Sequence, residues 1–230
     1  MSMQAVILAA GMGTRLGRPW PKPLTPLADG RTIMGQQMDN LEQVFGEDLR
    51  VMTVVGFKLE MILEAFPNVA YVYNELFDQT NTNRSLLKAL RIAPDGGVLW
   101  MNGDVVFDPR VLDRVKPLMD ADTSFICVNT SVVGEEEVKY TVDAAGHVAL
   151  LSKQVEAALG ESVGINFIAS HDRANLISGL EACLDSDYFE RGLEITIECN
   201  ATKVLPVDIT DLFAVEVDFE EDLTRANSHL

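Results

Sequence analysis

Two glycines near the N-terminus, followed by two cations, give the clearest chemical signal in the sequence. An apolar run over residues 5–10 leads directly into Gly11 and Gly13, and Arg15 and Lys22 follow on a proline-stiffened segment. Glycine lets a backbone approach a ligand without side-chain obstruction, and exposed loop amides can cradle phosphate oxygens. The pattern predicts a site for a polyphosphate, and the alternative is a tight turn with solvated basic side chains.

This loop differs from two common phosphate-binding patterns. No Gly-Lys-Ser/Thr follows the glycines, so it is not a Walker loop. Leu16 occupies the third glycine position of the dinucleotide fingerprint, and Asp29 does not follow a second predicted strand as a ribose-binding acid should. An NAD-dependent enzyme is therefore the weakest of the readings that the loop allows.

Two aspartates far apart in the sequence, Asp104 and Asp218, each follow a short apolar run predicted as a strand. Ligands of open α/β sheets bind outside the carboxyl ends of the strands. A pair of carboxylates can hold Mg²⁺, which takes its remaining ligands from water and phosphates. Glu216 shares the strand face of Asp218 and is the alternative ligand. Each aspartate alone could instead cap a helix or shape a turn.

The segment 74–86 is dense in amide and hydroxyl side chains ahead of a predicted helix. Asn83 and Ser85 supply the neutral donors and acceptors that reading a base edge requires. The alternative is a helix N-cap combined with an Asx turn.

Alternating strands and helices must position these residues. The sequence predicts strands over 5–8, 51–55, 69–73, 98–101 and 124–128. Helical patterns fall between them at 33–45, 59–65, 85–92 and 110–118. Strands separated by helices of this length imply crossover connections and a mainly parallel sheet.

The pattern changes after residue 130. The sequence predicts a hairpin over 138–142 and 148–151, a strand over 163–168, helices over 173–183 and 188–197, a strand over 212–217 and a closing helix from 219. We therefore expect one domain over 1–230, with a small acceptor-side lid insertion over roughly 130–200.

Composition limits the classes of protein to consider. The 230-residue chain is 47% hydrophobic, which suffices for a sizeable core, and it contains no apolar run of about 18 residues, so we expect no membrane span. With no leader-like N-terminus and three widely spaced cysteines expected in the core, we predict a cytoplasmic protein. The net charge of −17 argues against nucleic-acid binding, whereas residues 1–31 carry four basic side chains and one acid, a local surplus suited to a small polyanion.

At the glycine loop the sequence resembles the nucleotidyltransferases of GT-A-like fold, whose signature LAAGxGxRL…PKxL it matches from Leu8 onward. The resemblance implies a Rossmann-like three-layer sandwich. It also implies that Arg15 contacts the distal phosphates, that Lys22 bridges the α-phosphate and the acceptor phosphate, and that Asp104 and Asp218 coordinate Mg²⁺. No protein nucleophile is needed, because the acceptor's own phosphate attacks. The loop residues implied to wrap the nucleotide are Leu8, Ala9, Ala10, Gly11 and Gly13.

Within that family, segment 74–86 resembles the NxxY…TNNxxSL stretch of choline-phosphate and phosphonate cytidylyltransferases. The resemblance implies that Asn83 and Ser85 lie near cytosine and favours CTP. Phe77 stands where the family commonly has tyrosine, and Thr82 with Asn83 replaces an adjacent asparagine pair.

Three residues are expected on the acceptor side. Lys153 resembles the strand-end lysine that faces the acceptor phosphate, and Glu161 resembles an acid that meets a cationic head group. Tyr188 could add a cation–π contact to an ammonium. The alternatives are a solvated hairpin lysine for Lys153 and a core aromatic for Tyr188.

The function predicted is transfer of CMP from CTP to a phosphorylated or phosphonylated small molecule, with release of pyrophosphate. A sugar-1-phosphate nucleotidyltransferase using UTP, dTTP or GTP is the alternative, and a non-catalytic nucleotide-binding regulator is the second alternative. The state of assembly stays open, with a homodimer among the possibilities.

Overall fold

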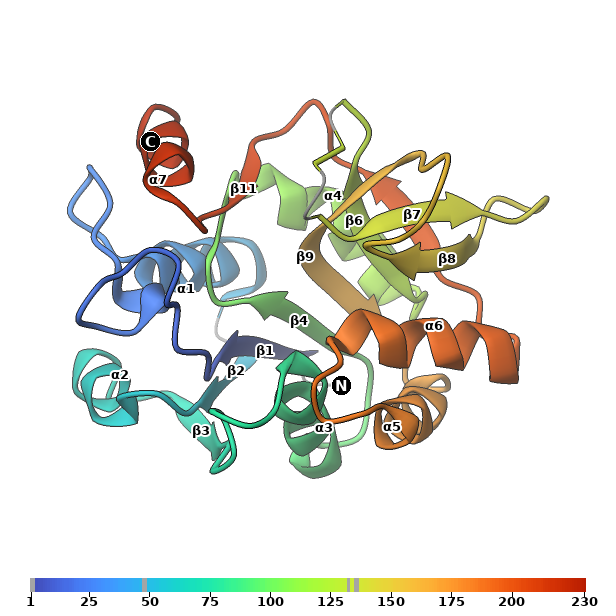
Figure 1. Ribbon diagram of the computed structural model, residues 1–230, viewed down its shortest axis with the longest axis horizontal. Helices are drawn as coiled ribbons and strands as arrows, with labels where there is room; N and C mark the ends of the chain where they lie inside the picture. Colours follow the sequence, from blue (N-terminus) through green and yellow to red (C-terminus); the bar gives the residue numbers. More distant parts are fainter. Residues whose placement is uncertain (1–2, 47–48, 132, 135–136) are drawn as a thin grey trace.

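A computed structural model describes residues 3–46, 49–131, 133–134 and 137–230. Within them a nine-stranded sheet crosses the protein, and its main path has the order β10-β6-β9-β4-β1-β2-β3 (Figure 1). The strands of this sheet are β1 (Met3–Ala9), β2 (Leu49–Val55), β3 (Ala70–Tyr73), β4 (Val98–Asn102), β6 (Phe125–Asn129), β7 (Lys139–Val142), β8 (Val148–Ser152), β9 (Gly160–Ile168) and β10 (Leu205–Asp208).

The sheet is mixed and mainly parallel, as the sequence predicts. Strands β4, β1, β2 and β3 pair in parallel, and so do β10 and β6. Strand β9 runs antiparallel to both of its neighbours in the main path, β4 and β6. The β7–β8 hairpin continues the sheet from one end of β9.

Helices cover both faces of the sheet and complete three layers (Figure 1). Successive side chains of a strand point to opposite faces, so Val6 and Leu8 of β1 pack in one cluster while Ala5 and Ile7 pack in the other. The first cluster includes residues of helices α3 (Thr82–Ile92), α5 (Arg173–Ala182) and α6 (Phe189–Asn200). The second includes residues of helices α1 (Ile33–Phe45), α2 (Leu59–Ala65) and α4 (Arg110–Asp120).

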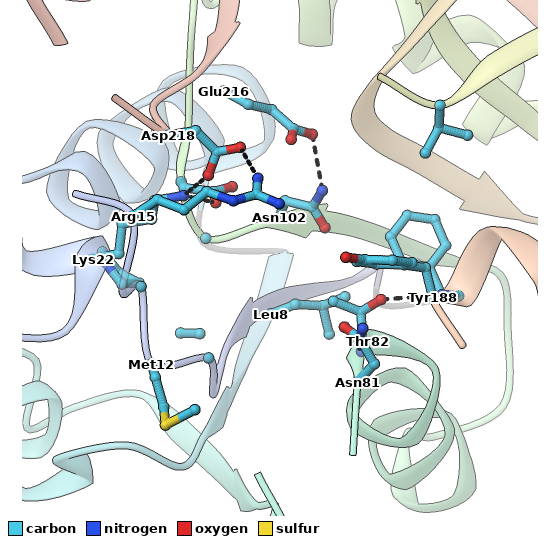
Figure 2. A pocket seen from close by; sticks show the side chains of 18 of the residues that line it. Leu8, Met12, Arg15, Lys22, Asn81, Thr82, Asn102, Tyr188, Glu216 and Asp218 are labelled. Carbon is cyan, nitrogen blue, oxygen red and sulfur yellow. Dashed lines mark hydrogen bonds and ion pairs between the residues drawn. The ribbon is translucent and has the colours of Figure 1, made fainter. Parts of the chain in front are cut away.

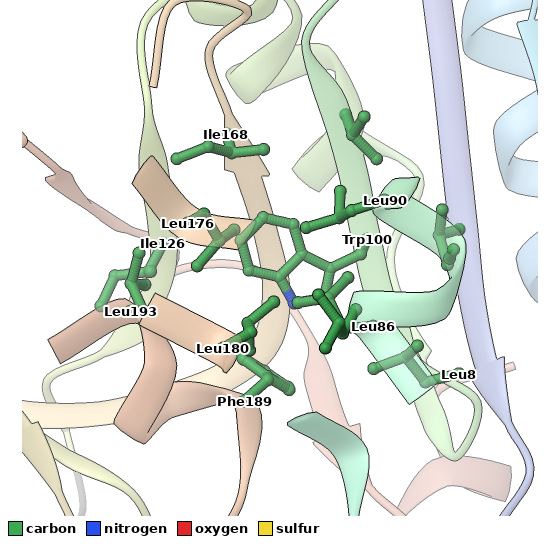
Figure 3. Close-up of a cluster of buried hydrophobic side chains, with 14 of the residues drawn as sticks. Leu8, Leu86, Leu90, Trp100, Ile126, Ile168, Leu176, Leu180, Phe189 and Leu193 are labelled. Atoms are coloured by element: carbon green, nitrogen blue, oxygen red, sulfur yellow. The ribbon is translucent and has the colours of Figure 1, made fainter. Parts of the chain in front are cut away.

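Trp100 of β4 lies at the centre of the first cluster and is fully buried (Figure 3). Its indole meets the ring of Phe189 edge to face, with ring centroids 5.6 Å apart, an arrangement that aromatic pairs prefer. Phe189 is the first residue of α6. The packing therefore fixes the N-terminal end of α6 against the middle of the sheet.

Three short elements escape the sequence patterns: the 3₁₀ turn over Lys22–Leu24, strand β5 (Val105–Phe107) and strand β10. Strand β5 pairs antiparallel with β11 (Ala214–Glu216), which precedes helix α7 (Glu220–Asn227). The 3₁₀ turn and β5 are three residues long and β10 is four, and these three short stretches show no periodicity that would reveal an element. Helix α3 begins three residues before its predicted start, because the Asn81 side chain accepts a hydrogen bond from the amide of Thr82 at 2.8 Å and caps the helix.

The stretch expected to form a lid contains the β7–β8 hairpin, β9, α5 and α6. Since β9 lies inside the main path of the sheet, part of this stretch is integral to the fold. The assignment of 1–230 to one domain stays a prediction. Cys127 and Cys183 are buried as expected, but Cys199 is exposed near the end of α6, so the prediction for that residue is wrong. Among the described residues, no helix has the length and apolar character that crossing a membrane requires.

Candidate active site

A pocket opens at the carboxyl ends of β1 and β4, beside the glycine loop and the N-terminal ends of α3 and α6 (Figure 2). Ten of the residues predicted from the sequence to form a site line it. They are Leu8, Ala9, Gly11, Gly13, Arg15, Lys22, Asp104, Lys153, Tyr188 and Asp218.

The wall formed by the glycine loop depends on close backbone contacts. Gly13 has a φ of 58°, and a Cβ there would lie 2.9 Å from the Cβ of Lys22. Gly103 donates its amide to the carbonyl of Leu8 at 2.9 Å, and a Cβ on Gly103 would lie 2.7 Å from that oxygen. Side chains at these positions would separate the loop from Lys22 and β1 from the turn after β4, so the glycines allow these elements to converge.

The β5–β11 ladder brings the two distant aspartates together. Val106 pairs with Val215, and the amide of Val217 donates to the carbonyl of Asp104 at 3.0 Å. Asp104 and Asp218 consequently reach the same ammonium group, that of Lys22. The sequence could identify both acids but not the ladder that joins them.

Lys22 bridges the two carboxylates, and Figure 2 shows Lys22 and Arg15 beside Asp218. Its Nζ donates to Asp104 Oδ2 at 2.7 Å and also to Asp218 Oδ1, while Arg15 Nη1 donates to Asp218 Oδ2 at 2.9 Å. Burial disfavours the charged lysine, but the two carboxylates outweigh burial and raise the pKa of Lys22 to about 12. Burial likewise opposes ionisation of Asp218, yet Lys22 and Arg15 hold its pKa below the ordinary value. Lys22 and Asp218 are therefore both charged at neutral pH.

The two carboxylates fit a magnesium site. Both bind one ammonium, and among the described residues the Oδ1 of Asp104 is buried without a hydrogen-bond partner. The described part of the chain gathers no group of three His, Cys, Asp or Glu side chains suited to a metal, so an ion here would need water or phosphate as further ligands. Glu216, the alternative ligand, accepts a hydrogen bond from Asn102 Nδ2 at 2.9 Å. Burial and the nearby Asp104 charge raise the pKa of Glu216 well above its ordinary value.

The opposite wall combines acids with an aromatic ring and a lysine. Lys153 follows β8 directly, and its Nζ lies 5.2 Å from the centre of the Tyr188 ring. Glu190 is 7% exposed, and its Oε2 is buried with no hydrogen-bond partner among the described residues. Burial raises the pKa of Glu190 to about 7. For Glu137 in the same wall, burial and then the Glu161 charge raise the pKa above its ordinary value.

Glu190 should make folding stability depend on pH. Its pKa is higher in the folded protein than the ordinary 4.5, so the stabilisation that comes with its proton is full below about pH 4.5 and is lost as pH rises through about 7. Glu190→Gln cannot ionise. We therefore expect its free energy of unfolding, relative to that of wild type, to rise by about 2 to 3 kcal/mol from about pH 5 to pH 8. Urea unfolding of both proteins at the two pH values measures this gain. Because Glu137 and Glu216 are present in both proteins, a difference that does not change with pH would contradict the raised pKa of Glu190.

Four predicted site residues lie outside the pocket lining. Ala10 is buried, and its carbonyl accepts the amide of Phe57 at 3.1 Å. Glu161 Oε2 accepts the amide of Gly134 at 3.0 Å. The other two are Asn83 and Ser85.

Asn83 and Ser85 support the fold behind the pocket wall. Asn83 is fully buried and donates to the carbonyl of Leu184 at 2.6 Å. Ser85 Oγ accepts a hydrogen bond from Asn74 Nδ2 at 3.1 Å. In this structure neither side chain reaches the pocket, since the earlier start of α3 places both within the helix and its packed side.

Sequence reasoning missed several pocket residues. Thr80, Asn81 and Thr82 line the wall where Asn83 and Ser85 were expected. Thr82 Oγ1 accepts the amide of Phe189 at 3.0 Å and so joins the start of α3 to the start of α6. The Asn-Thr-Asn run could have suggested a helix start at Thr82. No local pattern indicates that the start of α6 lies against the start of α3 and brings Glu190 into the pocket.

Comparison with known proteins places this site in a family. A model of the MobA-like NTP transferase domain matches residues 5–182. The chain belongs to this family. The matched segment contains the glycine loop, Lys22 and Asp104, whereas Asp218 lies beyond it.

Two curated relatives match this chain over different lengths. CMP-5'-(3-aminopropyl)phosphonate synthase from Streptomyces rubellomurinus is 39% identical over 128 residues, which are 52% of this chain and 20% of the relative. The bifunctional protein GlmU from Methanococcus maripaludis is 31% identical over 244 aligned positions, which cover 99% of this chain and 54% of the relative. The chain thus spans at most about half the length of these two relatives.

Solved structures agree with the fold. The inositol-1-phosphate CTP transferase from T. maritima superposes with a TM-score of 0.78 at 17% identity, covering 99% of this chain and 96% of the other. The CTP:phosphocholine cytidylyltransferase from Streptococcus pneumoniae superposes with a TM-score of 0.77 at 16% identity, covering 100% and 99%. The α/β nucleotidyltransferase fold expected from the sequence is confirmed.

Proposed function

We propose that this NTP transferase family member moves CMP from CTP to a small phosphorylated or phosphonylated acceptor that carries a cationic group. An acceptor oxygen forms a bond to the α-phosphorus, the bond from the α-phosphorus to the oxygen bridging the β-phosphorus breaks, and pyrophosphate leaves with that electron pair. The acceptor is already an anion, so the reaction needs no protein nucleophile.

The observation that carries the proposal is the convergence of Arg15, Lys22, Asp104 and Asp218 on one wall of the pocket. Two anions must meet in the reaction, and a preorganised cation between them stabilises the charge that develops. We assign this role to Lys22 and contact with the distal phosphates to Arg15. Asp104 and Asp218 would hold Mg²⁺, which supplies polarisation of a phosphoryl oxygen.

The acidic wall supports a cationic group on the acceptor. Glu190 is a buried acid whose Oε2 has no hydrogen-bond partner in the described part of the chain, and Tyr188 presents a half-exposed ring to the same pocket. A carboxylate and an aromatic face are the two partners that suit an ammonium. Lys153 lies over the same ring and is assigned to the acceptor phosphate or phosphonate. The names of the related aminopropylphosphonate and phosphocholine enzymes are consistent with this acceptor class.

The pocket should discriminate between pyrimidine bases. Cytosine presents an exocyclic amine and a ring acceptor, whereas uracil reverses this pattern, and an unpaired buried polar group costs about 1–3 kcal/mol. We expect CTP to exceed UTP by about 10- to 100-fold in kcat/KM. Asn81→Ala should reduce this ratio more than Ser85→Ala, because Asn81 lines the pocket and Ser85 does not. Equal ratios for wild type and Asn81→Ala would remove Asn81 from base recognition.

Pyrophosphate release tests the function as a whole. Four NTPs would be combined with phosphocholine, phosphoethanolamine, 3-aminopropylphosphonate, alkyl phosphates without an ammonium group and sugar 1-phosphates. We expect turnover with CTP and an acceptor that carries a cationic group, and much less with an alkyl phosphate of the same length that lacks one. Best turnover with a sugar 1-phosphate and UTP, dTTP or GTP would show that the cytidylyl proposal is wrong, and NTP binding without turnover would favour a regulator.

A further inference from the structure

Arg15 and Lys22, two of the cations that the proposed reaction uses to bind phosphates, are paired with the carboxylates that would hold the metal. Lys22 bonds to Asp104 and Asp218, and Arg15 bonds to the second oxygen of Asp218. The Lys22 side chain is only 9% exposed, whereas the side chains of Asp104 and Asp218 are 22% and 26% exposed. In the structure these ion pairs therefore occupy the carboxylates and the cations that a metal ion and phosphates would bind.

These ion pairs compete with ligand binding. Both Asp218 oxygens and one Asp104 oxygen already accept hydrogen bonds from cations, and of the four carboxylate oxygens only Asp104 Oδ1 has no partner among the described residues. A divalent ion between the two carboxylates would meet the ammonium of Lys22, and two cations a few ångströms apart repel strongly in a partly buried site. Metal binding thus requires Lys22 to move, and Lys22 needs another anion in place of the aspartates.

We propose that Lys22 is a built-in counter-ion that occupies the metal site until a nucleotide phosphate replaces the aspartates as its partner. Metal binding and nucleotide binding then depend on each other. The inference rests on the metal site of the proposed function. It adds that the free protein is a poor metal binder, because the catalytic lysine competes with the metal for the same carboxylates. Linkage makes the dependence reciprocal: whatever factor the metal adds to nucleotide affinity, the nucleotide adds to metal affinity.

The test measures Mn²⁺ binding by electron paramagnetic resonance without nucleotide, so that no turnover is involved. We expect Lys22→Gln to bind Mn²⁺ at least about tenfold more tightly than wild type, because one competing charge is gone. Lys153→Gln is the matched control, since it removes the same charge from another wall of the pocket and should change the affinity much less. Lys22→Gln with Asp104→Asn should lose the tight site.

Several outcomes would overturn the proposal. Mn²⁺ affinity of Lys22→Gln equal to or weaker than that of wild type would do so, as would an equal gain in Lys153→Gln or tight binding that survives Asp104→Asn. Lys22→Arg keeps the charge and covers the case in which Lys22→Gln does not fold: its affinity should stay as weak as that of wild type, and a tenfold gain would contradict the competition. Failure to release pyrophosphate with any NTP would sink the proposed reaction but leave these Mn²⁺ measurements unaffected.

Discussion

Replacing Lys22 with glutamine is expected to lower kcat by about 10²-fold or more, the scale of one lost electrostatic contact in a transition state. The charge matters most when the acceptor oxygen approaches the α-phosphorus, because two anions are then closest together. KM for CTP should change much less than kcat, since Arg15 and the loop amides would still hold the nucleotide. Steady-state pyrophosphate release measures both constants.

The matched control is Lys116→Gln on α4, which removes the same charge from a lysine paired with Asp120 outside the pocket. This control should keep wild-type kcat. Circular dichroism must show that Lys22→Gln is folded, because the change leaves two carboxylates without their shared ammonium. A folded Lys22→Gln protein with wild-type kcat and only a raised KM would show that the assigned role is wrong.

Replacing Asp104 with asparagine is expected to abolish most activity across millimolar Mg²⁺. The change is nearly isosteric and removes one of the two carboxylates that would hold the ion, so the fold should persist while metal affinity falls. Excess EDTA should stop the wild-type enzyme in the same way. Turnover with and without the chelator, together with thermal unfolding, separates loss of metal from loss of structure.

Asp113→Asn on the exposed face of α4 is the control for this change and should keep wild-type activity. Full turnover of the wild-type enzyme in EDTA would end the metal hypothesis for both aspartates. Retained turnover of Asp104→Asn in millimolar Mg²⁺ would instead transfer the assignment to Asp218 and Glu216.

The sequence alone predicted the α/β class, the mixed and mainly parallel sheet and most helix bounds. These features are local, because apolar periodicity of two or near four residues repeats within one element. The glycine loop was equally local: Gly11, Gly13, Arg15 and Lys22 lie within one short stretch, and all line the pocket.

The tertiary structure alone decided which distant residues meet. Strand β5 is three residues long and carries no recognisable pattern, and nothing in the sequence predicts its pairing with β11, yet this pairing brings Asp104 to Asp218. The hydrogen bond that the Asn81 side chain accepts from the Thr82 amide starts α3 earlier than expected, so that Thr80, Asn81 and Thr82 line the wall predicted for Asn83 and Ser85. Glu190 reached the pocket because Phe189 packs on Trp100. The β5–β11 pairing and the Phe189–Trp100 contact depend on packing between elements far apart in the chain, and therefore leave no periodicity in either segment.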